Sequence, residues 1–221
     1  EHINEMLKLR TTRVEIGVQT IFDEVLKKTN RGHTVEDTLR AIQLAKDSFL
    51  KCVFHVMPGL PDITKEQDVE CFKEYFSNSS YRPDGLKIYP CMVMPGTALW
   101  VQYKAGRFKP ITTNEAAEII SEGKRFIEPY CRVHRVQRDI PTNVTEAGVD
   151  RTNLRQYVFE KIKEKKIKCK CIRCREPMNH DIDFDNVELR RIDYEASNGK
   201  EFFLSFEDTK NDLILGFVRL R

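Results

Sequence analysis

Three cysteines lie within six residues of one another, at Cys169, Cys171 and Cys174, near the end of a basic segment. Sulfurs this close cannot all form disulfides with one another without strain. Three thiolates at C-x-C-x-x-C spacing can instead converge on one soft, tetrahedral metal ion. The spacing therefore predicts a structural zinc site. Two alternatives stay open, an iron–sulfur cluster and a set of three unrelated buried thiols.

A structural zinc ion requires four ligands, so the three cysteines leave one position to fill. His180 is the nearest candidate in the sequence and is our predicted fourth ligand. Cys131, Cys91 and a water molecule are the alternatives.

The charge of the chain is concentrated around these cysteines. Residues 151–175 hold ten Lys or Arg against two Glu, a net charge of +8, whereas the whole chain carries +3. Residues 181–221 are acidic, with ten Asp or Glu against six basic residues. A concentrated positive segment is typical of proteins that contact the phosphates of nucleic acid. The simpler alternative is a solvated helix face.

Bulk composition indicates a globular protein of the reducing cytoplasm. The chain has 221 residues, 40% of them hydrophobic and 32% charged. The sequence contains no apolar run of about 18 residues, so we expect no membrane association. We expect no secretory leader at the first residues, which read as a helix. Seven cysteines at irregular spacing fit metal ligation better than a disulfide framework.

The first 140 residues alternate strand-like and helix-like patterns. Helices are expected near 22–28, from a capping box at Thr34 and Asp37, from Thr64 to about 76, and over 115–127. The expected buried strands are residues 13–19, 51–57, 85–89 and 132–137. Strands alternating with helices predict an α/β fold with a parallel sheet. Four strands are too few for a closed barrel, so the sheet is either incomplete or partial by nature, as an open sheet or as a partial parallel β/α barrel.

The remaining chain changes character. Thr152 or Asn153 is expected to cap a basic helix that ends near Glu164. We expect β-strands at 187–194, 201–206 and 213–219, the last two forming a hairpin. A sheet this small is marginal alone, so it must pack on the preceding domain or on chain outside this sequence.

Small-molecule sites in parallel sheets gather at loops that follow the strands. This rule selects Gln19 with Thr20, the loop 58–61 and the Met- and Pro-rich loop 90–97, which is expected to run to Trp100. Lys87 and Tyr89 alternate with apolar neighbours and so point to one side, toward a barrel lumen or a polar face.

Many short motifs in one order give the chain a specific resemblance over nearly its whole length. It resembles the catalytic subunit of Elongator, a radical-SAM enzyme fused to an acetyltransferase domain, in its archaeal or bacterial form. The motifs are residues 17–20, 30–34, 55–61, 86–90, 135–141, 153–155, 172–176 and 188–194.

The resemblance implies a radical-SAM enzyme that carboxymethylates the wobble uridine of tRNA at carbon 5. It implies S-adenosylmethionine and a 4Fe–4S cluster as cofactors, acetyl-CoA as substrate, and tRNA as partner, with or without other Elongator-type subunits. Three domains are expected. They are the C-terminal part of a radical-SAM partial barrel at 1–141, a basic helix and zinc linker at 142–186, and the start of a GNAT-type acetyltransferase domain at 187–221.

The resemblance also assigns roles to single residues. Gln19, Pro58 and Gly59 are expected to bind the cofactor, and Lys87 and Tyr89 to be catalytic. The expected RNA contacts are Arg135, Arg138, Arg155, Lys161, Lys168, Arg173 and Arg175.

The sequence departs from the family in two ways. The three cluster cysteines of the family and its CoA-binding loop have no counterpart in this sequence. The polypeptide as given should therefore be inactive by itself. Two other functions stay open, a protein lysine (histone) acetyltransferase and a non-catalytic RNA-binding scaffold.

Overall fold

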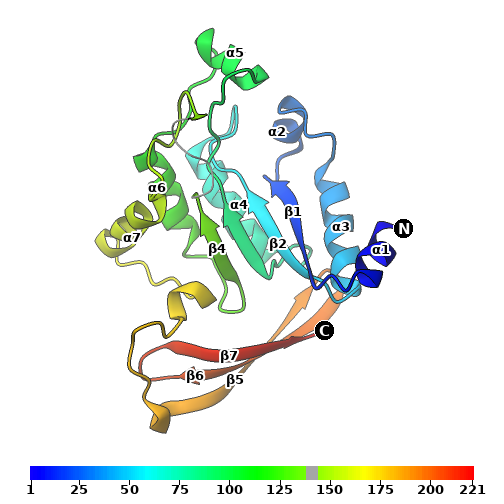
Figure 1. Cartoon of the computed structure of the whole chain (residues 1–221), viewed down its shortest axis with the longest axis vertical. Coiled ribbons are helices and arrows are strands. Elements are labelled where there is room, and N and C mark those ends of the chain that lie inside the picture. The colour runs from blue at the N-terminus through cyan, green and yellow to red at the C-terminus, as the bar shows by residue number, and fades with distance from the viewer. Residues whose placement is uncertain (138–143) are drawn as a thin grey trace.

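The computed structural model describes residues 1–137 and 144–221, which form two sheets in contact with each other (Figure 1). The first sheet is parallel, with the strand order β1-β2-β3-β4. Its strands are β1 (Arg13–Gln19), β2 (Lys51–Val56), β3 (Gly85–Ile88) and β4 (Arg132–Val136). The predicted α/β fold with an open parallel sheet is confirmed.

Helices connect these strands, and three of them begin with the capping boxes of Thr34, Thr64 and Thr112. At each, the threonine side chain accepts a hydrogen bond from the backbone three residues on, which satisfies a helical N–H group. The helices are α1 (His2–Lys8), α2 (Asp23–Lys28), α3 (Val35–Asp47), α4 (Lys65–Ser77), α5 (Ala98–Lys104), α6 (Thr113–Gly123) and α7 (Leu154–Glu164).

Helix α5 corrects the expectation of an unbroken loop to Trp100. Thr97 caps this helix by accepting a hydrogen bond from the Trp100 backbone at 3.2 Å. Met, Pro and Gly residues precede the cap and favour a loop. The helix itself has only seven residues, so its hydrophobic periodicity is too short to be recognised in the sequence.

The parallel sheet has one apolar face and one polar face. Phe54, Leu86 and Val133 are fully buried in the core shared with α3, α4 and α6, and α4 lies behind the sheet in Figure 1. Glu15 and Lys87 alternate with these apolar positions and lie on the other face. Inward- and outward-facing residues alternate along the strands of a barrel, so this polar face corresponds to the lumen side of a partial barrel.

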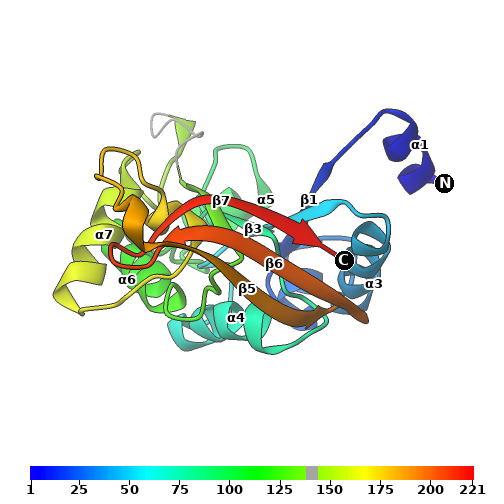
Figure 2. The same ribbon diagram turned by 90° about the horizontal axis from the view of Figure 1, so that it is seen from below.

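The second sheet is antiparallel and lies below the first in Figure 1, so that it is in front in the view from below (Figure 2). It contains β5 (Val187–Ala196), β6 (Gly199–Asp208) and β7 (Leu213–Leu220). The predicted hairpin of the last two strands is present. The first two strands also form a hairpin, whose turn residues Ser197 and Asn198 have φ of 45° and 62°. Two successive positive φ values are typical of the tight turn that matches strand twist.

This second sheet packs on the preceding chain, as its small size predicted. The ring of Tyr194 stacks on Tyr130 with centroids 3.9 Å apart. The Ser197 backbone N–H donates to the carbonyl of Ser79 at 2.7 Å. Tyr194 and Phe203 belong to the same hydrophobic core as the parallel sheet. The two sheets are therefore held together by shared burial.

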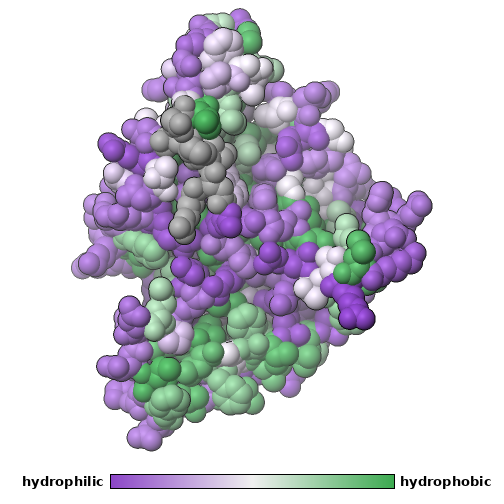
Figure 3. Space-filling model, viewed as in Figure 1, coloured by the Kyte–Doolittle hydropathy of each residue, from purple (hydrophilic) through white to green (hydrophobic). Residues whose placement is uncertain are grey.

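The outer face of the antiparallel sheet is apolar, as the green area at the lower end of Figure 3 shows. The strand register places Leu189, Phe206, Val218 and Leu220 on this face, and each is more than half exposed. No part of residues 1–137 and 144–221 covers them. Within the same described ranges, none of the helices is both long enough and apolar enough to cross a membrane.

Candidate functional site

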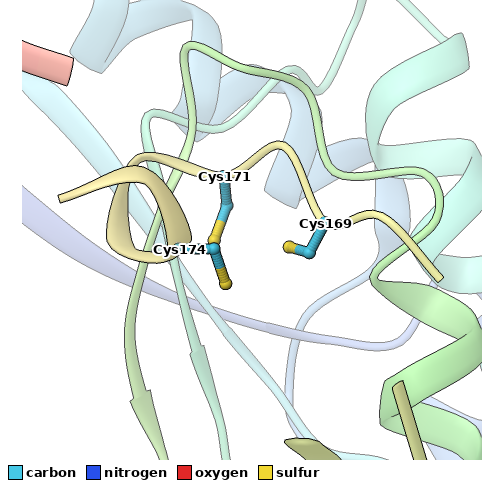
Figure 4. Close-up of side chains that lie close together, drawn as sticks. All are labelled: Cys169, Cys171 and Cys174. Carbon is cyan, nitrogen blue, oxygen red and sulfur yellow. The ribbon is translucent and has the colours of Figure 1, made fainter. Parts of the chain in front are cut away.

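The three cysteines of the basic segment come together as the spacing predicts (Figure 4). The sulfurs of Cys169, Cys171 and Cys174 all lie within 4.8 Å of one another. Cys171 is fully buried, and the other two are partly buried. Three sulfurs at this separation provide the soft donor set that zinc prefers, so the residues present fit a zinc ion.

Local backbone structure explains why this spacing brings the sulfurs together. Cys171 precedes a single 3₁₀ turn, η2 (Ile172–Arg175). Residues three apart lie above one another in such a turn, which brings Cys174 next to Cys171. The Cys174 N–H donates to the Cys171 carbonyl at 2.9 Å, and the Ile172 N–H donates to the Cys131 carbonyl at 3.0 Å. The second bond anchors the turn beside β4.

Lys124, which belongs to no motif of the sequence, lies against this cluster. The Lys124 Nζ lies 3.4 Å from the sulfur of Cys169, 3.6 Å from that of Cys174 and 3.9 Å from that of Cys171. Hydrogen bonds from Cys169 and Cys174 lower the pKa of the Cys171 thiol, and the positive charge of Lys124 lowers it further. Burial raises this pKa but is outweighed.

The fourth ligand stays open. His180, the predicted one, is exposed and lies outside the group of close sulfurs, although it lines the same 560 Å³ cavity as Cys169 and Cys174. Cys91 lies in a separate small cluster with Val25 and Leu60 and does not belong to this site.

The predicted cofactor residues lie at the carboxyl edge of the parallel sheet. The Met57 N–H donates to the Gln19 carbonyl at 3.0 Å, which places Gln19 at the ends of β1 and β2. Pro58 and Gly59 follow directly and are buried. Tyr89 lies at the end of β3 and lines a mostly apolar 360 Å³ cavity with Met57 and other residues. The structure thus brings Gln19, the Pro58 loop and Tyr89 to one edge.

Gly59 is held in a conformation that other residues rarely adopt. Its φ is 80°, and a Cβ atom there would lie 2.6 Å from the side chain of Ile111. Its N–H donates to the Asp68 carboxylate at 2.8 Å. Burial raises the pKa of Asp68 to about 7, although the hydrogen bond from Gly59 acts in the opposite direction.

We expect Asp68→Asn to change how stability depends on pH. Because the native pKa of Asp68 is raised from 3.8 to about 7, the native state holds a proton that the unfolded state has lost between these pH values. Stability of the parent protein therefore falls as pH rises through this window. The variant should be more stable at pH 8, by up to about 4 kcal/mol, and equal near pH 4. Denaturant unfolding at several pH values measures this difference. Parallel pH curves for both proteins would contradict it, and Asp185→Asn, an exposed site, is the control.

A charged pair crosses the polar face of the parallel sheet. The Lys87 Nζ lies 2.5 Å from the Glu15 carboxylate, which also contacts the His55 ring at 2.8 Å. Burial raises the pKa of Glu15, but the hydrogen bonds from Lys87 and His55 outweigh it and lower that pKa to about 2. Tyr89 lies beside His55, with ring centroids 5.7 Å apart. Lys87 and Tyr89, the predicted catalytic pair, therefore belong to one polar group on the lumen face.

Three of the predicted RNA contacts line one cavity next to the end of β4. Arg135, Arg155 and Arg173 surround a volume of about 640 Å³, which Phe159 also lines. The Arg155 Nη1 atom is buried, and residues 1–137 and 144–221 provide no hydrogen-bond partner for it. Burial lowers the pKa of Arg155, and the nearby charge of Arg173 lowers it further. Such clustered guanidinium groups favour an anionic ligand.

The other predicted RNA contacts are placed differently. Lys161 pairs with Glu164 at 2.9 Å on α7, and Lys168 is exposed and pairs with Asp212 at 2.8 Å. Arg175 is only 7% exposed and forms ion pairs with Glu207 and Asp212 of the antiparallel sheet. Because its guanidinium group is buried and already paired, Arg175 is poorly placed to contact RNA, contrary to the prediction. Arg138 lies outside the described residues.

The fold and this edge of polar groups define the class to which the chain belongs. A sequence model described as the Radical SAM superfamily matches residues 1–74, and one described as the Radical_SAM C-terminal domain matches residues 83–164. An open parallel sheet with its polar face toward a lumen agrees with that class.

Individual relatives define the family more narrowly. The chain is 49% identical over 228 residues to a protein of Methanocaldococcus jannaschii named tRNA uridine(34) acetyltransferase, covering 100% of this chain and 42% of the relative. It is 43% identical to Elongator complex protein 3 of Saccharomyces cerevisiae, covering 100% and 40%.

A solved structure agrees with these sequence relatives. The archaeal Methanocaldococcus infernus Elp3 with an N-terminal deletion matches with a TM-score of 0.95 and 48% identity, over 98% of this chain and 52% of that one. The chain belongs to the Elongator complex protein 3 family, as its motifs predicted. It spans about two fifths of the length of the curated relatives.

Proposed function

We propose that this chain is part of an enzyme that carboxymethylates the wobble uridine of tRNA at carbon 5. The observation that carries the proposal is the identity over the whole chain to a protein named for action on tRNA uridine 34. The proposed substrate that donates the acetyl group is acetyl-CoA. The proposed cofactors are S-adenosylmethionine and a 4Fe–4S cluster, whose cysteine ligands come from outside this sequence.

Within this reaction the cofactors supply the radical, and the residues of this chain supply placement. Gln19, Pro58 and Gly59 form part of the cofactor wall at the carboxyl edge of the sheet. Lys87, oriented by Glu15, and Tyr89 face the lumen, where they contact the reacting groups. The antiparallel sheet is the beginning of an acetyltransferase domain. Zinc at the three cysteines is structural.

The cavity of Arg135, Arg155 and Arg173 is the proposed place of contact with the RNA backbone. It lies beside the carboxyl end of β4, on the same sheet edge as the proposed cofactor wall. Guanidinium groups bind phosphate in a planar, two-point manner, and Phe159 offers an aromatic surface for a base. The positive excess of residues 151–175 provides the surrounding field.

We expect Arg173→Glu to weaken tRNA binding and to reduce its salt dependence. Loss of one phosphate contact lowers the slope of log affinity against log salt by about one unit. Fluorescence anisotropy with tRNA at several salt concentrations measures both quantities. Lys163→Glu is the matched control, because it makes the same charge change at an exposed position of α7 that does not line the cavity. Equal losses of tRNA affinity in both variants would show that Arg173 acts only through the net charge of the protein and not through a specific phosphate contact.

Acetyl-CoA turnover separates the proposed reaction from the two other functions. A full-length protein containing this chain should turn over labelled acetyl-CoA when tRNA is added, and not when histone-tail peptides are added. Turnover with the peptides alone would favour a lysine acetyltransferase. Binding of tRNA without turnover would favour a scaffold.

A further inference from the structure

Lys124 is buried at the end of α6, and no carboxylate among the residues that the structure describes pairs with it. Its side chain is 0% exposed, and its hydrogen bonds in the described part of the chain go only to the sulfurs of Cys169, Cys171 and Cys174. The ring of Phe159 lies 5.9 Å from its Nζ. An ammonium group removed from water costs several kcal/mol unless opposite charge is close. The three sulfurs are the groups that can supply it.

The charge of an occupied metal site matches this need. A divalent ion bound by three thiolates carries a net charge of −1, and one lysine brings that total to zero. Metal binding also requires the thiolate form, which a nearby positive charge stabilises. The other fully buried lysine, Lys46, has a carboxylate as its opposite charge, because its Nζ lies 2.7 Å from Glu201.

We propose that Lys124 is the counter-ion of the three-cysteine metal site, donating N–H hydrogen bonds to the sulfurs and stabilising the bound ion without ligating it. This inference rests on the proposed zinc site. It gives α6 a direct link to the loop that follows α7, across 45 to 50 residues of sequence. Lys124 is a positioning residue, because it acts on the ion through the sulfurs.

The test is the zinc affinity of Lys124→Met, measured by competition with a chelator. Loss of a hydrogen-bonding partner of metal ligands weakens metal affinity by about 10- to 100-fold, and we expect a change of that size. The cobalt-substituted variant should keep the thiolate-to-cobalt charge-transfer bands of three sulfur ligands. Lys124→Gln keeps N–H donors but no charge and should lose affinity as well, which gives a second variant if Lys124→Met does not fold.

Lys46→Met is the matched control, because it removes an equally buried lysine away from the sulfurs. It should lose stability and keep zinc affinity. Unchanged zinc affinity in both Lys124 variants would overturn the role of Lys124 while leaving the zinc site. A change in cobalt coordination number in Lys124→Met would make Lys124 a ligand and overturn its role as a counter-ion. A parent protein that takes up no zinc would remove both proposals.

Discussion

Glu201→Ala is expected to lower the free energy of unfolding by about 3–5 kcal/mol, because it removes the carboxylate that lies closest to a buried positive charge. The Glu201 carboxylate accepts from Lys46 at 2.7 Å and from the Tyr194 hydroxyl at 2.7 Å, and it pairs with Arg221 at 3.2 Å. Lys46 belongs to α3, whereas Glu201 belongs to β6. The interaction therefore joins a helix that packs on the parallel sheet to the antiparallel sheet.

The remaining carboxylate of this network cannot replace Glu201. Asp84 lies 3.6 Å from the Lys46 Nζ and 3.0 Å from Arg219, and it already accepts from the Cys52 backbone at 2.7 Å. After the substitution, the buried Lys46 and Arg219 share this one buried acid, whereas Arg221 keeps its ion pair with Asp47. We expect the double variant Lys46→Met/Glu201→Met to recover much of the loss, since it removes both charges together.

Denaturant unfolding of the single and double variants measures this network. Glu188→Ala is the control, because its ion pair with Arg190 is more than half exposed and should contribute less than about 1 kcal/mol. Glu201→Gln keeps a hydrogen-bond acceptor and serves if Glu201→Ala does not fold. A Glu201→Ala protein as stable as Glu188→Ala would show that the two sheets do not depend on this charge network.

Apart from the short helix α5, the regular elements were predictable because local sequence determines them. Thr34 and Asp37 mark the start of α3 through a capping box that involves only neighbouring residues. The apolar strands of the parallel sheet are readable for the same reason, since alternate burial follows from residue type. The C-x-C-x-x-C cluster was predictable because one short turn brings its sulfurs together.

The surroundings of the site depend on contacts distant in sequence, and there prediction was incomplete. Lys124 falls on the buried side of α6, four residues after Ile120 and eight after Ala116, a position that usually carries an apolar residue. A lysine at an apolar position of a helix was therefore the sequence signal that could have identified Lys124. Arg175 was expected at the surface with its basic neighbours. It is buried because Glu207 and Asp212, more than 30 residues later, supply its counter-charges.

Cys171→Ser is expected to reduce bound zinc from about one ion per chain to nearly none, because it removes one of three soft ligands. Cys171 is the most buried of the three, and it stands at the start of the turn that positions Cys174. Since metal binding contributes free energy to the folded state, chelation should lower the melting temperature of the parent protein and leave that of the variant unchanged.

Two other substitutions serve as a control for this experiment and as a test of the fourth ligand. Cys91→Ser removes a buried thiol that lies in a different cluster, so it should keep the full zinc content. His180→Ala tests the predicted fourth ligand, and a large loss of zinc affinity would assign His180 to the ion. A weak effect would leave the fourth position to Cys131 or to water. Zinc retained by Cys171→Ser would place the ion elsewhere, and the three sulfurs would then be a cluster of thiols around Lys124.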